Sequence, residues 1–557
     1  MSALEELALA EMEQDGYAPE PKRATASKPR KRPRSVDGIA ATDSEGRPRK
    51  QADMLLDIGR RHELFHGPDG TAYARAGVAV YAIESSQYRE VLAARFLDIA
   101  DKGCGRNALA DAITTLSSLA KHRGERRDVH LRTGTHGAGL AIDPGRDDWH
   151  MIEITADGWQ WCANPPMFRR TSAMGKLPEP GAPDFSRIWR YLNVAEEHRV
   201  LVAGWMLAAL RPTGPFPILF LAGEQGTGKS TAARVLRKLI DPSASLLRAP
   251  PKDVQDLLIG ALNGWVLALD NLSYLGPQLS DGLCRIATGG AISGRTLYTN
   301  AEETLIEVQR PAIVNGIEDL ATRPDLAERG LHVDLDVIES RLPESEFWRG
   351  FDNDAPHIFG AILAGIAASI RDHTTIQLGR LPRMADFAQW AAAGIGPLGF
   401  TADEFMTAYR DNQNIGMGAG VDSSPVGRVL LEWIRNRREW AGTAANLLSA
   451  LEGFADESTR RSHAWPKSPR GLSGAIKRLA PALRIQGIEV EQDRSAQARN
   501  IRLCNLPEQP SQPSQPSFAR HGNDANDAND DDDGLSPGLH VVADCPRCDG
   551  EGCQWCR

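Results

Sequence analysis

The sequence lacks the features of a membrane or secreted protein. No apolar run among its 557 residues approaches the ~20 residues that span a membrane. The first residues, MSALEELALAEMEQDG, lack the basic-then-apolar order of a secretory signal. These absences predict a soluble, cytoplasmic protein with no membrane partner.

Cysteine is scarce, and half of the cysteines stand alone. Four of the eight are isolated in the sequence, namely Cys104, Cys162, Cys284 and Cys504. In a reducing compartment such residues are expected to be reduced thiols of the core rather than parts of a disulfide framework. The other four cluster near the C-terminus and suggest a different role, considered below.

Positive charge is also in deficit, but it is unevenly distributed. The net charge of −9 argues against uniform coating of nucleic acid, although residues 28–34 (KPRKRPR) and 47–50 (RPRK) are basic and residues 523–533 are acidic.

The length of the chain predicts about three or four domains. Residues 1–52 are polar and basic, which predicts a disordered arm that is either a solvated tail or a nucleic-acid contact.

A glycine-rich turn follows the apolar run FPILFLA and precedes a segment with helical spacing of apolar residues. The turn matches the P-loop pattern of glycine, four residues, then Gly-Lys-Ser. We predict an ATP site formed by Gly223, Glu224, Gln225, Gly226, Thr227, Gly228, Lys229, Ser230 and Thr231.

Each part of this turn has a chemical role. Glycines let backbone N–H groups point at the β-phosphate, and the helix N-terminus adds its positive dipole. Lys229 reaches the β and γ oxygens, and the hydroxyl of Ser230 ligates Mg²⁺. About forty residues later the apolar strand GWVLALD ends in Asp270, where a second Mg²⁺ ligand belongs in a P-loop ATPase.

The segment after this strand contains a predicted hairpin and a polar strand end. Its expected strands are RTLYT and TLIEVQ with NAEE at the tip, after a Gly289-Gly290 turn. The next strand, PAIVN, ends in Asn315. A predicted helix over residues 195–210 precedes the strand that leads to the glycine-rich turn.

These ordered elements resemble the superfamily three helicases, the AAA+ ATPases of phages, plasmids and large DNA viruses. The likeness covers residues 195–375 and implies a homo-oligomeric ring, usually a hexamer, that threads nucleic acid. It implies that Asn315 positions the attacking water. It also implies an arginine finger acting on a neighbouring subunit, either Arg329 or its substitute Arg323, although a surface arginine before a strand is the alternative.

Two positions depart from the pattern of this family. Asn271 stands where a second acidic residue usually orients the hydrolytic water, and it cannot accept a proton. The hairpin tip has Asn300, Glu302 and Glu303 in place of basic or aromatic residues, so phosphate repulsion opposes threading. Arg295 and Arg310 at the hairpin base remain as candidates for backbone contact with DNA.

Residues 53–180 predict an α+β domain with no assigned chemistry. Alternating strands surround a helix near residues 107–122. Asp143, Asp147 and Asp148 are the acidic residues at a strand end, and a solvated turn explains them better than a two-metal site. Residues 376–424 predict a helical connection.

Residues 425–503 predict a winged helix of three helices followed by two strands. Basic residues lie on the third helix and in or beside the wing, and the DNA contacts we expect are Arg470, Lys477, Arg478, Arg494 and Arg499. A winged helix that docks protein is the alternative.

The C-terminus predicts a linker and a metal site. Residues 505–540 are rich in proline and acid, and residues 541–557 carry Cys545, Cys548, Cys553 and Cys556 as two CxxC pairs. Four thiolates suit one tetrahedral Zn²⁺, and the CxxCxGxG half resembles the zinc repeats of DnaJ-type chaperones. A site shared between chains and a redox dithiol stay open because the pairs are closely spaced.

The sequence as a whole predicts an α/β protein with an AAA+ P-loop core. We expect a DNA helicase or replication initiator of a phage or mobile element that uses ATP, Mg²⁺ and Zn²⁺. A nucleotide-dependent DNA-binding switch with slow hydrolysis is the alternative, and both Asn271 and the acidic hairpin tip favour it.

Overall fold

The structure, a computed structural model, describes most of the chain up to residue 505. The described ranges are 35–36, 38–162, 165–295, 303–316, 323–338, 340–422, 424–462, 464–494 and 499–505. They belong to the first of two units into which the chain divides, Met1–Leu506. The predicted linker from residue 506 on and the four-cysteine tail lie outside the described residues.

The first domain packs three helices against a small sheet with strand order β5-β4-β3-β6. Its core includes Ile39, which is 4% exposed. The predicted disordered arm over residues 1–52 is therefore too long, because the chain from Gly38 onward belongs to this domain. The elements are β1 Ser35–Val36, β2 Ile39–Ala40, α2 Gln51–Gly59, β3 Glu63–His66, β4 Ala72–Ala76, β5 Ala79–Ala82, α3 Ser86–Ala100, α4 Arg106–Arg123 and β6 Glu125–Arg126.

The second basic patch of the sequence is paired with acids inside this domain. Arg47 forms ion pairs with Asp43 and Glu45, and Arg49 forms one with Asp57. These pairs neutralise much of the local positive charge, so they weaken the prediction that this patch contacts nucleic acid.

A second sheet follows, with strand order β10-β9-β8-β7 and antiparallel pairing throughout. Its apolar residues, including Leu140 and Ile152, share one core with helices of the region that follows, including Leu201 and Leu236. The single domain predicted over residues 53–180 is therefore wrong, because its second half packs elsewhere. The strands are β7 Thr133–His136, β8 Gly139–Ile142, β9 Met151–Thr155 and β10 Gly158–Cys162.

Asp143 is buried rather than part of a solvated turn. The guanidinium of Arg170 donates to both of its carboxylate oxygens, at 2.8 and 2.7 Å, and the backbone N–H of Gly145 donates to one of them. A buried carboxylate that is fully paired has a structural role. This pairing could not be predicted from the sequence because Arg170 is 27 residues from Asp143 along the chain.

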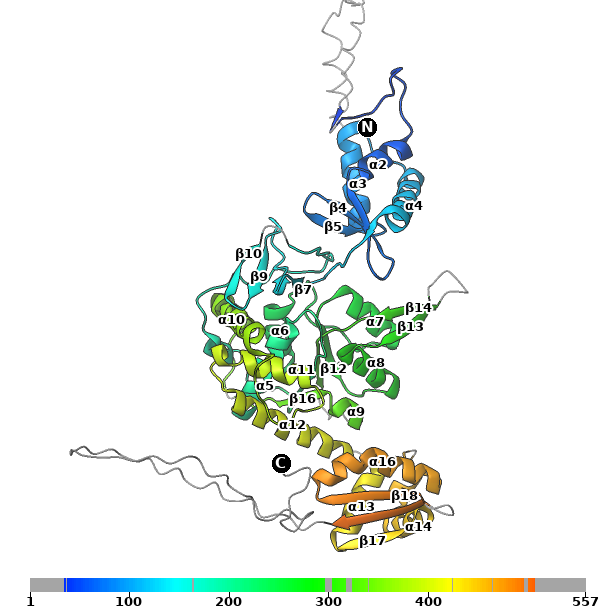
Figure 1. Ribbon diagram of the computed structural model, residues 1–557, viewed down its shortest axis with the longest axis vertical. Helices are drawn as coiled ribbons and strands as arrows, with labels where there is room; N and C mark the ends of the chain where they lie inside the picture. Colours follow the sequence, from blue (N-terminus) through cyan, green and yellow to red (C-terminus); the bar gives the residue numbers. More distant parts are fainter. Residues whose placement is uncertain are drawn as a thin grey trace, which may run out of the picture. The chain divides into compact units, whose positions relative to one another are not determined.

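A four-stranded parallel sheet forms the centre of the next region, with strand order β12-β15-β11-β16. Alternate residues of each strand face two different layers. Leu219 and Leu221 pack with α5, α6 and the later helix α10 (Glu344–Asp372), whereas Ile218 and Phe220 pack with α7 and α8 (Figure 1). The elements are η1 Phe185–Arg190, α5 Glu196–Ala209, β11 Ile218–Ala222, α6 Lys229–Ile240, α7 Val254–Asn263, β12 Leu267–Leu272, α8 Pro277–Thr288, β15 Ala312–Gly316, α9 Pro324–Ala327 and β16 Gly330–Asp334.

A buried ionic cluster joins the second sheet to this region. Asp241, just after α6, accepts hydrogen bonds from Arg132 at 3.0 Å and from Arg237 at 3.1 Å. The backbone N–H groups of Trp265 and Val266 also donate to it, each at 3.0 Å. The three charged side chains are almost completely buried, so each depends on the others to balance its charge.

The predicted hairpin is present, but its first strand starts earlier than the sequence indicated. β13 Ala291–Arg295 pairs antiparallel with β14 Glu303–Glu307. Gly289 and Gly290, with φ of +81° and +158°, precede β13 as predicted. Residues 296–302, which include most of the expected tip, lie outside the described residues.

Three helices continue from the parallel sheet. They are α10 Glu344–Asp372, α11 Ala385–Gly394 and α12 Ala402–Asp422, with η2 Gly396–Leu398 between the last two.

A smaller domain ends the described chain. In this domain a three-stranded sheet, order β17-β19-β18, packs with the helices around one core. Besides the three predicted helices and two strands, it contains β17 and α15. Its elements are α13 Pro425–Arg435, β17 Glu439–Thr443, α14 Ala444–Phe454, α15 Glu457–Arg461, α16 Pro469–Ile485, β18 Ile488–Arg494 and β19 Arg499–Asn505.

No helix within the described ranges has both the length and the apolar character needed to cross a membrane.

Candidate nucleotide-binding site

The glycine-rich turn lies between β11 and α6, at the carboxyl end of a central strand. Gly226 and Gly228 have φ of +91° and +85°, a backbone conformation that side chains with a Cβ rarely adopt. Gly223 has φ of +138°, and a Cβ there would lie 2.9 Å from the carbonyl oxygen of Leu335. The glycines are therefore needed for the shape of the turn.

Lys229 is the first residue of α6, and its side chain lies back over the turn. The ammonium donates to the carbonyl oxygens of Gly223 at 2.6 Å and Glu224 at 2.7 Å. This places a positive charge beside the concave side of the loop, which is where the P-loop pattern predicts phosphate oxygens.

Ser230 and Asp270 are brought together from separate elements. The hydroxyl of Ser230 donates to Oδ1 of Asp270 at 2.8 Å. Asp270 belongs to β12, and Ser230 belongs to the first turn of α6. A hydroxyl and a carboxylate at this distance are oxygen ligands of the kind that Mg²⁺ prefers.

Asn315 at the end of β15 is linked to Asn271. The backbone N–H of Asn271 donates to Oδ1 of Asn315 at 2.7 Å. This contact fixes the amide orientation, so Nδ2 of Asn315 is the remaining donor. Nδ2 is buried, and the described residues provide no acceptor for it. A buried amide donor without a partner is costly in a folded protein, and a ligand at this position would satisfy it.

A pocket of about 690 Å³ opens beside the turn. The predicted residues Gln225 to Thr231 form one wall, and Asn271 also lines it. Two further walls come from the end of η1 with the residues after it, and from the segment before α10 with the start of that helix. Their lining residues are Trp189, Arg190, Tyr191, Leu192, Asn193, Ile338, Ser340, Arg341, Leu342, Glu344, Phe347 and Trp348.

The aromatic part of the pocket wall is held in place by a buried carboxylate. Tyr191 packs edge-on against Phe347, with ring centroids 5.4 Å apart. Its hydroxyl donates to Asp354 at 2.7 Å, and Arg187 donates to the same carboxylate at 2.8 Å. Burial alone would raise the pKa of Asp354, but the hydrogen bonds from Tyr191 and Arg187 outweigh it and hold the pKa below its usual value.

Two family models match this chain in succession. The model described as actinomycete integrative conjugative element replication protein matches residues 186–414. The model described as AICE RepA C-terminal domain matches residues 426–516, and the two together span more than half of the chain. The chain belongs to this RepA family. The prediction of a replication protein from a mobile element is thereby confirmed.

Solved structures give a weaker likeness for this RepA-family chain. The A form apo structure of the NrS-1 C-terminal region is 12% identical, with a TM-score of 0.35, and the match covers 82% of this chain and 99% of that chain. Another apo structure of that region is 11% identical, with a TM-score of 0.33, and the match covers 82% and 98%. A comparison with curated proteins gave no match.

The two arginine-finger candidates of the RepA-family chain are both paired within the chain. Arg329 lies just before β16, is mostly buried, and forms an ion pair with Asp325. Arg323 is more exposed and forms an ion pair with Asp281 at 2.8 Å. Each would have to exchange its acidic partner before reaching a neighbouring subunit. Their role in trans remains a prediction.

Arg310 does not have the position that a DNA contact requires. Its guanidinium lies 4.9 Å from the ring centroid of Trp265 and donates to the carbonyl oxygen of Ala261 at 3.0 Å. Burial lowers its pKa to about 10. The Arg310 side chain is therefore held against α7 and Trp265. Arg295 ends β13, and its side chain lies outside the described residues, as do those of Arg494 and Arg499.

The basic residues of α16 form an exposed stripe. Arg470 and Lys477 are seven residues apart and so lie on one face of the helix, with Arg478 beside them. Arg484, seven residues beyond Lys477, extends the stripe and is also exposed. Sequence reasoning missed Arg484, although the same spacing would have identified it.

The pocket also contains residues that the sequence did not reveal. Arg341 reaches the P-loop, with its guanidinium 3.5 Å from the carbonyl oxygen of Gly226. Arg234 of α6 lines the pocket near Glu344. The aromatic wall combines Tyr191 with Trp348 from far along the chain, and no local pattern links these residues.

Proposed function

We propose that this chain is a P-loop ATPase that acts on DNA during replication of its mobile element. The observation that carries the proposal is the contact between Ser230 and Asp270 beside Lys229, at the edge of a roomy pocket. A hydroxyl, a carboxylate and an ammonium group in this arrangement suit a Mg²⁺-bound triphosphate.

The pocket suggests how the parts of the nucleotide are held. Backbone N–H groups of the loop and the N-terminus of α6 would bind the β-phosphate, and Lys229 would bind the β and γ oxygens. Arg341 adds a second positive charge near the loop. Tyr191, Phe347 and Trp348 provide an aromatic surface at the other side of the pocket, which suits a nucleobase.

Asn315 is suited to a role in hydrolysis. Its Nδ2 is a buried donor without an acceptor among the described residues, and its Oδ1 is held by Asn271. In the proposed complex Nδ2 would donate to the γ-phosphate or to the attacking water. Bound Mg²⁺ would neutralise charge that develops on the phosphate oxygens.

An AAA+ ring with a DNA-binding winged helix is the architecture we favour. The parallel sheet, the hairpin between β12 and β15, and the polar end of β15 support the first part. The second part is supported by the order of helices and strands from α13 to β19, and by the basic stripe on α16. Zinc binding by the C-terminal cysteines is kept as a separate proposal.

The double substitution Lys477→Ala and Arg478→Ala is expected to weaken DNA binding. Removing one phosphate contact should reduce the slope of log affinity against log salt by about 0.9 for duplex DNA, so removing two should reduce it by about 1.8. Binding isotherms at several salt concentrations measure this slope. Arg428→Ala, which removes an exposed charge from α13, is the matched control. An unchanged slope in the double variant would exclude the α16 stripe as a phosphate-binding surface.

A nucleotide-dependent DNA-binding switch is the second candidate. One specific observation favours it: Asn271, which lines the pocket, supplies no proton acceptor and is held with φ of +55°. Such a protein would bind MgATP, assemble and rearrange on DNA, and hydrolyse slowly.

Asn271→Asp is expected to raise ATP turnover at least about tenfold, because a positioned general base contributes about 10²- to 10⁴-fold. Aspartate suits this position because asparagine and aspartate tolerate the left-handed backbone conformation better than glutamate does. Steady-state turnover of both proteins at saturating MgATP measures the effect, and Asn271→Ala serves as the control. An unchanged or lower rate would show that another residue already acts as the base.

A further inference from the structure

Three side chains with metal-binding atoms converge on one face of the second sheet. Cys162 pairs with Met151, which is two residues before Glu153 on β9. Glu153 pairs with Ala141, and Ala141 pairs with Gly134, two residues before His136 on β7. Since residues directly opposite or two apart share a face, this register puts Cys162, Glu153 and His136 on the same side.

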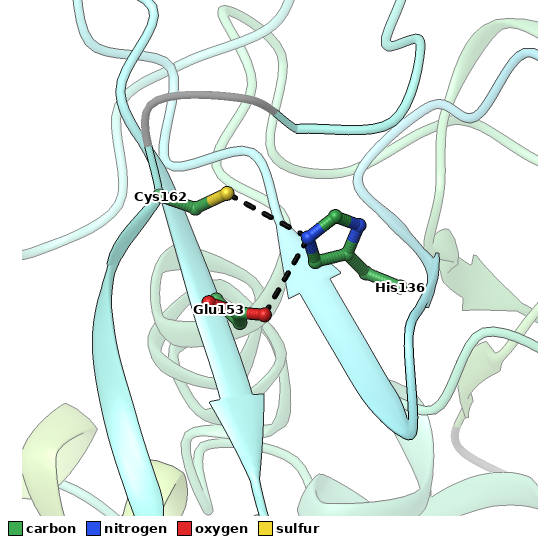
Figure 2. A group of neighbouring side chains, drawn as sticks. All are labelled: His136, Glu153 and Cys162. Atoms are coloured by element: carbon green, nitrogen blue, oxygen red, sulfur yellow. Dashed lines mark hydrogen bonds and ion pairs between the residues drawn. The ribbon is translucent and has the colours of Figure 1, made fainter.

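The ligand atoms of these residues lie close together (Figure 2). Nε2 of His136 is 3.7 Å from Sγ of Cys162 and 3.4 Å from Oε1 of Glu153. All three ligand atoms lie within 4.8 Å of one another. Cys162 is buried, and the other two side chains are partly buried. Cys162 is a free, buried thiol, as the sequence predicted, but a histidine lies beside its sulfur.

The geometry does not fit a nucleophilic triad. In a triad the base contacts the nucleophile through one ring nitrogen, and the orienting carboxylate contacts the other. Here the thiol and the carboxylate both approach the same nitrogen, Nε2 of His136, as Figure 2 shows. Convergence of three groups on one point is the arrangement that a shared metal ion requires.

The distances also suit a tetrahedral ion. Ligands at about 2.0–2.3 Å from a tetrahedral metal are separated from one another by about 3.3–3.8 Å. Both measured separations from Nε2 of His136 fall within this interval. We propose that His136, Glu153 and Cys162 bind a divalent transition metal, and that Zn²⁺ is the ion this thiolate, imidazole and carboxylate set favours.

The neighbouring Gln160 supports this assignment. Its Nε2 donates to Oε2 of Glu153 at 2.7 Å, which leaves Oε1 directed toward His136. Hydrogen bonds of this kind orient a ligating carboxylate. The ion would connect β7, β9 and β10, and water would complete its coordination. The site is independent of the ATPase proposal and of the C-terminal cysteines.

The test uses the full chain with Cys545, Cys548, Cys553 and Cys556 replaced by serine, so that the tail contributes no zinc. After incubation with Zn²⁺ and gel filtration, elemental analysis should find about one zinc per chain. Adding Cys162→Ser or His136→Ala should reduce this content to near zero, whereas Cys104→Ser, which removes another free thiol, should leave it unchanged.

Co²⁺ provides a readout of the thiolate itself. The cobalt-loaded chain should show near-ultraviolet thiolate-to-metal absorption that Cys162→Ser abolishes.

Gln160→Ala tests the residue that orients Glu153. Because Gln160 is exposed, the variant should fold normally, and it should weaken cobalt affinity about 10- to 100-fold. A folded chain without tail cysteines that retains no zinc and shows no cobalt band would overturn the proposal, as would zinc content unaffected by Cys162→Ser and His136→Ala.

Discussion

Lys229→Ala is expected to raise the Kd for MgATP at least about a hundredfold. Charge-assisted hydrogen bonds contribute about 1.5–3 kcal/mol each, and Lys229 is placed to make two of them to the β- and γ-phosphates. The backbone donors of the loop remain in the variant, but they do not replace the ammonium charge. Calorimetric titration with MgATP measures the affinity of both proteins.

Lys252→Ala is the matched control for this experiment. Lys252 is exposed in the same region and does not line the nucleotide pocket. Its removal should leave MgATP affinity unchanged. If Lys229→Ala bound MgATP as tightly as the unmodified chain while remaining folded, the loop would not be the phosphate site.

Asp241→Ala is expected to lower the free energy of unfolding by about 3–5 kcal/mol. The substitution leaves the buried guanidinium groups of Arg132 and Arg237 without their carboxylate, and removal of one partner from a buried ion pair is strongly destabilising. It also removes the acceptor of two backbone N–H groups. Denaturant unfolding followed by circular dichroism measures the change.

Asp352→Ala is the surface control, because Asp352 is exposed and pairs with Lys238 at 3.3 Å. Exposed ion pairs contribute about 0–1 kcal/mol, so its effect should be small. A similarly small effect of Asp241→Ala would show that the buried cluster does not hold the second sheet to α6.

The same cluster gives a pH dependence of stability. Burial would raise the pKa of Asp241, but Arg132 and Arg237 outweigh burial and lower it. A carboxyl whose pKa is lower in the folded chain stabilises that chain above its unfolded pKa of about 3.9. This stabilisation is lost as the pH falls through the folded pKa, and Asp241→Asn should remove this part of the acid sensitivity.

The glycine-rich turn of the candidate site could be predicted because its signals are local. Gly223, Gly228, Lys229 and Ser230 lie within one turn between a strand and a helix, and each residue type has a separate chemical reason to be there. Asp270 could be predicted from its place at the end of an apolar strand. The structure brings Ser230 and Asp270 into contact, as that reasoning requires.

Contacts between distant segments could not be predicted from local patterns. Tyr191 and Phe347 meet only because η1 and α10 pack together, and their shared partner Asp354 has no motif. Arg310 was misassigned for a similar reason. Its charge suggested a DNA contact, but the fold places Trp265 and a carbonyl oxygen beside its guanidinium.

The cluster of His136, Glu153 and Cys162 illustrates the same limit for β structure. His136 and Cys162 lie on strands at opposite edges of one sheet, with Glu153 between them in the sequence. The spacing of these residues matches no familiar metal motif, since their approach depends on strand register and sheet curvature.

ATP turnover by the full chain, measured with and without single-stranded DNA, is the decisive test of the proposed function. We expect saturable hydrolysis that requires Mg²⁺, is abolished in Lys229→Ala, and rises when single-stranded DNA is added. Binding of MgATP with little turnover and no response to DNA would favour the switch. Turnover that persists unchanged in Lys229→Ala, or a folded chain that neither binds nor hydrolyses MgATP, would contradict the proposed function.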